Sequence, residues 1–173
     1  MSKESRIYLI GFMGSGKSSL GKELSAALKL NFIDLDAVIE EKTNEELHNF
    51  FKKSEKSFRA LEAKTLRELT FNNTVYALGG GTPCFFDNMD FIKENGISVF
   101  LKVSEDKLYE RLKKHRKIRP LLSEKDETEL REYISELLSE RKSFYDRADI
   151  IYDEEKMNIS SLIDKIDKID QFR

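Results

Sequence analysis

Cysteine is almost absent from this sequence, and its one thiol, Cys84, stands alone. A single cysteine cannot form an intramolecular disulfide, which favours a reducing compartment, and we expect the cytoplasm. No CxxC pair and no cluster of cysteine and histidine occurs in the 173 residues, so the sequence argues against a zinc site. A chain of this length, 39% hydrophobic, can bury a core without disulfides or a structural metal.

Long apolar runs and an excess of charge of one sign are also missing. No stretch is long enough to span a membrane, and the N-terminal run IYLIGF is too short for a signal peptide. The 30 Lys and Arg residues face 32 Asp and Glu, a formal net charge of −2, so no global field would recruit nucleic acid or an anionic membrane. We expect a single domain over residues 1–173, a monomer that binds neither nucleic acid nor membrane.

Short apolar runs alternate with longer amphipathic stretches along the chain. Five strands are predicted, at residues 6–12, 31–35, 74–78, 97–103 and 149–152. Helices are predicted at 17–28, over 38–69 with breaks near Asn44 and Ser54, after Ser104, at 127–147 and at 159–169. Such alternation implies right-handed crossovers and an α/β fold, a five-stranded parallel sheet with helices on both faces.

Glycine is concentrated at the ends of predicted strands, where α/β proteins bind their ligands. The segment GFMGSGKS, residues 11–18, matches the pattern GxxxxGK[ST] of a phosphate-binding loop, with a strand before it and a helix after it. The glycines allow backbone conformations closed to other residues, and the helix N-terminus adds partial positive charge. We therefore expect one anion to be bound by the amides of Gly14, Ser15, Gly16, Lys17, Ser18 and Ser19.

Two side chains of this loop are predicted to serve chemistry. Lys17 can reach the β- and γ-phosphates of ATP, and the hydroxyl of Ser18 is suited to ligate Mg²⁺. The alternative is a glycine-rich turn in which Lys17 is merely solvated, and the agreement of the motif with its context disfavours it. The sequence therefore predicts ATP as co-substrate and Mg²⁺ as cofactor.

Further segments bear on which hydroxyl receives the phosphate. The elements GFMGSGKSS, FIDLD, SFRALE, ALGGG, RPLL and ERKSFY, in this order and with these gaps, resemble the shikimate kinase family, P-loop kinases related in fold to nucleoside monophosphate kinases. The resemblance covers roughly residues 6–155. It implies a three-layer P-loop kinase fold, with a mobile lid at about 112–126 and a substrate-binding helical region at about 36–70. The implied reaction is ATP-dependent phosphorylation of the 3-hydroxyl of shikimate, in the route to chorismate and the aromatic amino acids.

The resemblance also assigns roles in substrate binding. Arg59 and Arg141 match the family's carboxylate-binding arginines, and a guanidinium fork suits a planar carboxylate. Asp36 matches the aspartate that bonds the reacting hydroxyl, and Gly80 matches a backbone amide for the ring hydroxyls. Asp34 matches the carboxylate that supports the Mg²⁺ site. On an extended strand Asp34 and Asp36 would share one face, although two solvated aspartates at a strand end are the alternative.

The nucleotide side is assigned in the same way. Arg119 in RPLL matches the lid arginine that offsets charge as the phosphoryl group moves, so it is predicted to be catalytic together with Lys17 and Asp36. The arginine that stacks on adenine aligns with Arg111. A further family arginine, after the fifth strand, has no counterpart in YDEEKMN.

Other polar residues are expected to play supporting parts. Glu62 lies three residues after Arg59, a spacing that brings the two together on one helix face, and it is predicted to orient the guanidinium. His48 and His115 have no catalytic or ligand spacing and are expected at the surface. Cys84, beside the glycine turn, is expected to be a small packing residue.

Two other functions are compatible with a phosphate-binding loop. A kinase for another acceptor, such as gluconate or a nucleoside monophosphate, would share the loop and the fold, but the predicted acceptor site argues against it. A nucleotide-binding module without phosphotransfer would have no reason to keep the catalytic set, which comprises Lys17, Ser18, Asp34, Asp36 and Arg119. The basic run KKHRKIR lacks interleaved aromatic residues, which argues against a nucleic-acid patch.

Overall fold

The computed structural model describes residues 5–114, 122 and 125–171. One parallel sheet of five strands has the order β2-β3-β1-β4-β5. The strands are β1 (Arg6–Ile10), β2 (Asn31–Asp34), β3 (Thr74–Ala77), β4 (Ile97–Lys102) and β5 (Ile150–Asp153). The prediction of a five-stranded parallel α/β sheet is confirmed. β1 lies at the centre between β3 and β4, the position that its continuous apolar sequence favours.

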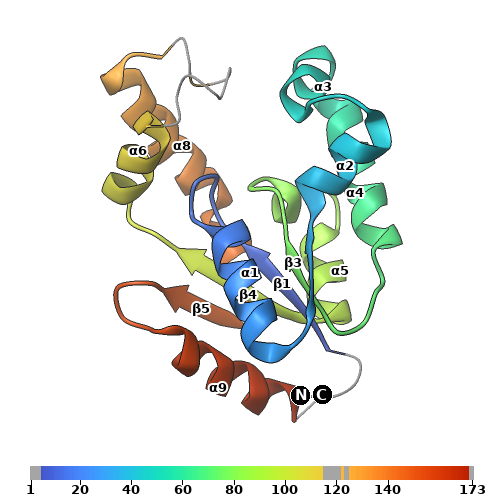
Figure 1. Ribbon diagram of the computed structural model, residues 1–173. Coiled ribbons are helices and arrows are strands. Elements are labelled where there is room, and N and C mark those ends of the chain that lie inside the picture. The colour runs from blue at the N-terminus through green and yellow to red at the C-terminus, as the bar shows by residue number, and fades with distance from the viewer. Residues whose placement is uncertain (1–4, 115–121, 123–124, 172–173) are drawn as a thin grey trace.

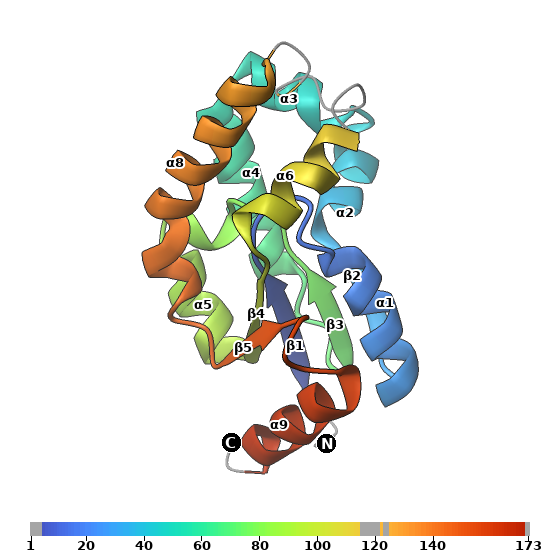
Figure 2. The ribbon, with the colours of Figure 1, turned by 90° about the vertical axis from the view of Figure 1, so that its left-hand side faces the viewer.

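Helices lie on both faces of this sheet. They are α1 (Lys17–Leu28), α2 (Leu35–Thr43), α3 (Leu47–Lys53), α4 (Glu55–Glu68), α5 (Asn88–Asn95), α6 (Glu105–Lys114), α8 (Glu127–Tyr145) and α9 (Ile159–Asp170), with a 3₁₀ turn, η1 (Thr82–Cys84). Figure 2 shows the sheet between α1 on one side and α4, α5 and α8 on the other. In the part of the chain that the structure describes, no helix is long and apolar enough to cross a membrane.

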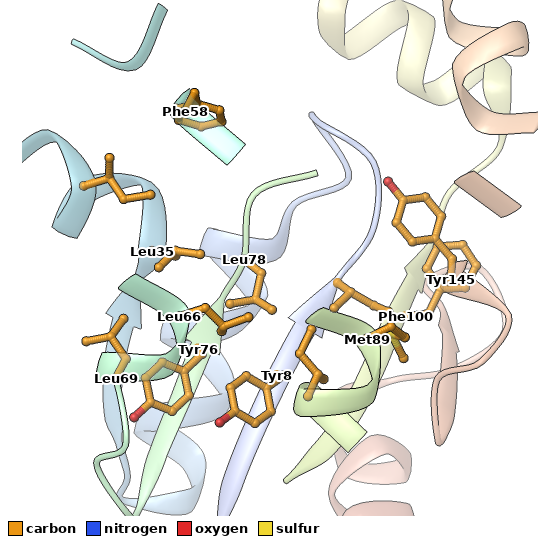
Figure 3. Close-up of a cluster of buried hydrophobic side chains, with 13 residues drawn as sticks. Tyr8, Leu35, Phe58, Leu66, Leu69, Tyr76, Leu78, Met89, Phe100 and Tyr145 are labelled. Atoms are coloured by element: carbon orange, nitrogen blue, oxygen red, sulfur yellow. The ribbon is translucent and has the colours of Figure 1, made fainter. Parts of the chain in front are cut away.

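The two faces of β1 bury alternate side chains, as the two-residue period of a strand requires. Ile7 and Leu9 pack in one cluster with side chains of α1 and α9. Tyr8 and Ile10 pack in a second cluster, against side chains of α2, α4, α5 and α8. In this second cluster Tyr8 stacks on Tyr76 of β3, with ring centroids 5.1 Å apart (Figure 3). Each face of the sheet is therefore covered by its own layer of buried side chains.

Helices flank the carboxyl ends of the strands. In Figure 1, α6 and the beginning of α8 stand on one side of these ends, and α2 and α3 stand on the other. The loop between β1 and α1 lies between the two groups (Figure 1). These elements therefore stand at the edge of the sheet where parallel α/β proteins bind their ligands.

The second strand ends one residue earlier than predicted, and the helix after it begins three residues earlier. β2 ends at Asp34 and α2 begins at Leu35, so Asp36 lies in the first turn of a helix and not on an extended strand. The carboxylate of Asp34 accepts a hydrogen bond of 3.1 Å from the amide of Asp36, which makes Asp34 the N-cap of α2. The argument that both aspartates share a strand face therefore fails, although both line one cavity, as shown below.

Two further differences between the predicted and the observed elements concern segments where the spacing of apolar residues gave no clear signal. The first strand ends at Ile10 and not at residue 12, because the chain turns at Gly11, whose φ is +142°. Helix α5 was not predicted; Met89 and Ile92 anchor it in the core. In the predicted lid, residues 115–121, 123 and 124 lie outside the described residues, and they include His115 and Arg119.

Candidate active site

The phosphate-binding loop connects β1 to α1 at the centre of the sheet. Gly14 and Gly16 have φ of +77° and +97°, a region that glycine enters without strain, and Gly16 is the N-cap of α1. Residues 14–19 line a cavity of about 570 Å³. The predicted loop therefore opens onto a cavity at a helix N-terminus, the place where backbone amides bind phosphate.

Lys17 is held inside this loop. Its Nζ donates hydrogen bonds of 2.9 Å to the carbonyl oxygens of Gly11 and Phe12, and the residue is only 9% exposed. The alternative of a solvated lysine is therefore wrong. The ammonium group also lines the cavity, so it lies where it can meet an anionic ligand.

Ser18 and Asp34 lie together on the wall of the same cavity. The hydroxyl of Ser18 donates a hydrogen bond of 2.6 Å to Oδ2 of Asp34. Within the described residues there is no cluster of three or more His, Cys, Asp or Glu side chains that could hold a metal ion. A hydroxyl and one carboxylate still fit Mg²⁺, which takes oxygen ligands and commonly completes its shell with substrate phosphates and water.

A second cavity, of about 400 Å³, lies beside the first. The predicted acceptor-binding residues meet there although they come from four parts of the chain: Asp36 from α2, Arg59 from α4, Gly80 from the turn after β3 and Arg141 from α8. Asp36, Gly80 and Met13 line both cavities. The two cavities therefore meet at Asp36.

The carboxyl group of Asp36 lies in an environment that disfavours its charge. Its pKa is raised from 3.8 to about 6, chiefly by burial and then by the negative charges of Asp34 and Glu62, while Lys17 opposes the rise. A carboxylate with a raised pKa at the junction of two cavities is a candidate for a functional group.

Arg59 is fixed from several directions. Its Nη1 donates a hydrogen bond of 2.9 Å to Glu62, a fully buried residue, so the predicted contact between them is confirmed. The hydroxyl of Thr82 donates a hydrogen bond of 2.5 Å to the other oxygen of Glu62. The guanidinium also lies over the ring of Phe85, 4.3 Å from its centroid. These contacts hold a buried cation at the wall of the second cavity.

Arg141 is the second buried cation, 8% exposed. Its guanidinium lies 5.8 Å from the centroid of the Phe12 ring, beside the phosphate-binding loop. One turn later in α8, the hydroxyl of Tyr145 donates a hydrogen bond of 2.6 Å to the carbonyl of Gly80. Helix α8 is therefore tied to the glycine turn that Arg141 faces.

Arg111 lies at the end of α6, on the wall of the first cavity. Its Nη1 donates to the carbonyl of Ser15 at 3.1 Å, and its Nη2 donates to both carboxylate oxygens of Glu154 at 2.6 and 2.9 Å. The structure thus brings Arg111 to the phosphate-binding loop, and its predicted stacking on adenine stays a prediction. Arg119, the other predicted nucleotide-side arginine, lies outside the described residues.

Sequence reasoning missed several polar residues that line the cavities. Glu154 and its neighbour Tyr152 line the first cavity, but an acidic residue in a turn after a strand gives no local signal of this. His48 lines the second cavity, where its Nδ1 lies 3.0 Å from a carboxylate oxygen of Glu46, and its side chain is 32% exposed, which agrees with the expected surface position. Cys84 is half-buried, and burial raises its thiol pKa to about 11, which agrees with a packing role.

Comparison with known proteins gives one consistent result. The family model described as shikimate kinase matches residues 13–170. The shikimate kinase of Phocaeicola vulgatus is 42% identical over 169 residues, covering 94% of this chain and 97% of the relative.

Solved structures agree with the sequence relatives. The shikimate kinase of Bacteroides thetaiotaomicron superposes with a TM-score of 0.84 at 37% identity and 97% coverage of both chains. The Acinetobacter baumannii enzyme, solved in complex with shikimate, gives a TM-score of 0.80 at 30% identity, covering 98% of this chain and 92% of that one. A gluconokinase from Sinorhizobium meliloti, 20% identical with a TM-score of 0.60, shares the fold alone. The chain belongs to the shikimate kinase family.

Proposed function

We propose that this chain carries out the reaction of its family, transfer of the γ-phosphoryl group of ATP to the 3-hydroxyl of shikimate, at the junction of its two cavities. The products are 3-phosphoshikimate and ADP, in the biosynthesis of chorismate and the aromatic amino acids. The observation that carries the proposal is that Asp36 and Gly80 line both the cavity of the phosphate-binding loop and the cavity of the two buried arginines. Donor and acceptor can therefore meet at one carboxylate.

The phosphates of ATP occupy the loop between β1 and α1 in this proposal. Backbone amides of residues 14–19 and the N-terminus of α1 bind them, and Lys17 exchanges its contacts with two loop carbonyls for contacts with phosphate oxygens. Because the ammonium already lies inside the loop, little reorganisation is needed when charge develops on the moving phosphoryl group.

The hydroxyl of Ser18 would bind Mg²⁺ directly. The carboxylate of Asp34 would support the ion indirectly, either through its hydrogen bond with Ser18 or through a bound water. When bound, the ion supplies positive charge that offsets the charge of the phosphates. The hydrogen bond of 2.6 Å between the two side chains holds their oxygens next to each other on the wall of the first cavity.

Shikimate would bind in the second cavity through its carboxylate and its hydroxyls. Arg59 and Arg141 are both cationic and nearly fully buried, and a desolvated guanidinium binds a carboxylate strongly. The ionised carboxylate of Asp36 accepts the hydrogen bond of the reacting hydroxyl and orients its oxygen toward the phosphoryl group. The amide of Gly80 is assigned to a ring hydroxyl.

The nucleotide side completes the proposal. Arg111 is assigned to the nucleoside, and Arg119, in the segment outside the described residues, is assigned to the phosphoryl group as charge moves. All residues that receive a role belong to one chain, which supports action as a monomer. We propose the cytoplasm as the location, because the reaction consumes ATP.

An acceptor screen tests this proposal. ADP release would be followed in a coupled assay with shikimate, gluconate and AMP in turn, and the phosphorylated product would be identified by ³¹P NMR. Rapid ADP release with shikimate alone is expected, and none with Lys17→Met as the matched control. Equal or faster turnover of gluconate or AMP would overturn the acceptor assignment, and binding of ATP without transfer to any acceptor would favour a nucleotide-binding module.

A further inference from the structure

Glu154 has no part in the proposed transfer of the phosphoryl group, yet it lies on the wall of the nucleotide cavity. It directly follows β5, and both of its carboxylate oxygens accept hydrogen bonds from Nη2 of Arg111. Lys107 donates a third hydrogen bond to it, at 3.2 Å. The contact with Arg111, followed by that with Lys107, lowers the pKa of Glu154 below its usual value, so the carboxylate is ionised at neutral pH.

Arg111 connects this carboxylate to the phosphate-binding loop. Its Nη1 donates to the carbonyl oxygens of Ser15, at 3.1 Å, and Gly14, at 3.4 Å, while Nη2 is directed at Glu154. A guanidinium group donates its hydrogen bonds in its own plane, and its two flat faces remain available for stacking. These hydrogen bonds fix the side chain along its edge, and stacking on a face of the guanidinium would not compete with them.

The order of the strands shows which end of the nucleotide this pair meets. Asp34 ends β2 at one edge of the sheet, Glu154 follows β5 at the other edge, and the phosphate-binding loop follows β1 in the middle. With strands about 4.8 Å apart, the two edge strands lie about 19 Å from each other. The acceptor cavity adjoins Asp36 on the β2 side, so a nucleotide with its phosphates in the loop extends its nucleoside toward β5.

We propose that Glu154 is a positioning residue of the ATP site: its carboxylate holds the guanidinium of Arg111 at the nucleoside end of the cavity, with one flat face toward the base. This inference rests on the proposed ATP site. Without Glu154, Arg111 keeps its contact with the loop but loses the second anchor that fixes its plane. ATP binding must then order the side chain, at a cost in conformational entropy.

Calorimetric titration of the full chain with Mg·ATP and with inorganic tripolyphosphate, both without shikimate, tests the proposal. Glu154→Gln keeps the shape and removes the charge, and it is expected to weaken ATP binding about 3- to 10-fold, because the ligand must then order the side chain of Arg111. Tripolyphosphate lacks a nucleoside, so its affinity is expected to change less than about twofold. In the kinase assay the KM for ATP should rise, while the KM for shikimate and kcat at saturating ATP stay near those of the parent chain.

Two comparisons separate positioning from a merely structural contact. Glu155→Gln is the matched control, because Glu155 bonds to the same Lys107, at 2.9 Å, but is not part of the cavity wall. It is expected to leave ATP affinity unchanged. In the background of Arg111→Ala, Glu154→Gln should have no further effect on ATP affinity, since the proposed role acts through that arginine.

Several results would overturn the inference. They are an unchanged ATP affinity in Glu154→Gln, an equal loss for ATP and tripolyphosphate, and an effect that persists without Arg111. If Glu154→Gln does not fold, Glu154→Asp is titrated under the same conditions, and normal ATP affinity with this shorter side chain, which withdraws the carboxylate from Arg111, counts against the proposal. Failure of the proposed function is distinguishable, because it would appear as absent turnover of shikimate in the parent chain, whereas these titrations need no acceptor.

Discussion

The hydroxyl of Ser18 donates a hydrogen bond of 2.6 Å to Asp34, and this contact joins the first turn of α1 to the end of β2. Asp34 also accepts a hydrogen bond from the amide of Asp36, so one carboxylate connects the proposed metal ligand to the helix that carries the proposed acceptor contact. Asp34→Asn removes the charge and keeps one acceptor oxygen, which can still accept from the amide of Asp36. Its NH₂ group cannot accept a hydrogen bond and would donate to the hydroxyl of Ser18 instead.

The first prediction concerns this charge. Asp34→Asn should leave the fold intact and raise the Mg²⁺ concentration for half-maximal rate about tenfold, because loss of a residue that supports a metal ligand typically weakens metal binding 10- to 100-fold. Excess metal should restore much of the turnover. Initial rates measured against free Mg²⁺ at a fixed ATP concentration would show the shift, and an unchanged Mg²⁺ dependence would remove Asp34 from the metal site.

The second prediction concerns Asp36. Asp36→Asn should weaken shikimate binding and depress kcat, while the affinity for Mg·ATP measured without acceptor stays near that of the parent chain. Calorimetric titration of Asp36→Asn and Asp34→Asn with each ligand compares the two carboxylates directly. The same binding profile in both variants would contradict the division of roles between them.

The third prediction is a dependence on pH that follows from the pKa of Asp36, raised to about 6. The ionised form accepts the hydrogen bond of the acceptor hydroxyl, so kcat/KM for shikimate should fall as the pH drops below about 6. The charge of Asp34 helps to raise the pKa of Asp36. Asp34→Asn should therefore move the acidic limb of the pH profile of kcat/KM to lower pH. A limb that does not move would mean that another group titrates.

The same pKa makes a fourth prediction, on stability. Because the pKa is about 6 in the folded protein against 3.8 as the ordinary value, the folded state binds more protons between these two pH values. The free energy of unfolding therefore decreases as the pH rises from 3.8 to 6, by up to about 3 kcal/mol. Above pH 6 this loss of stability, which comes from ionising Asp36 in the folded protein, is complete. Asp36→Asn should thus raise the Tm at pH 7.5 by an amount that shrinks toward pH 4, as measured by thermal unfolding across this range.

Much of the fold could be predicted because its signals are local. The continuous apolar run around Leu9 identifies a strand buried on both faces, and residues 11–18 carry the whole phosphate-loop motif within eight positions. The boundary at Leu35 could not be read in this way. It depends on the side chain of Asp34, which caps the N-terminus of α2. The spacing of apolar residues, from which the strand and the helix were predicted, carries no information about such a cap.

The missed residues of the site are those placed by contacts between distant segments. Glu154 reaches the nucleotide cavity because β5 pairs with β4, and it meets Arg111 across 43 positions of the chain. His48 lines the acceptor cavity because α3 packs on α4. Neither position, that of Glu154 beside Arg111 or that of His48 in the acceptor cavity, can be inferred from the spacing of residues along the sequence. The roles assigned to individual residues remain predictions, which the variants test.

A fifth prediction concerns the two buried arginines of the acceptor site and uses a glycine that touches one of them. A Cβ atom added at Gly81 would lie 2.7 Å from Nη1 and Nη2 of Arg59, so Gly81→Ala should displace the guanidinium. We expect the KM for shikimate to rise about tenfold, equivalent to the loss of one charge-assisted hydrogen bond, with little change in the KM for ATP. Arg59→Lys, which keeps the charge but loses the planar fork, should give the same pattern.

The control for this prediction is a second glycine that is equally crowded but remote from the acceptor. A Cβ atom added at Gly21 would lie 2.4 Å from the ring of Phe32 and 3.2 Å from Leu9, where α1 packs on the sheet. Gly21→Ala should therefore lower the Tm while leaving the ratio of the two KM values unchanged. Steady-state kinetics of both variants, with either substrate varied, decide the point. If Gly81→Ala raised both KM values equally, Arg59 would have a general structural role in the site. It would then not be the residue that binds the carboxylate of shikimate.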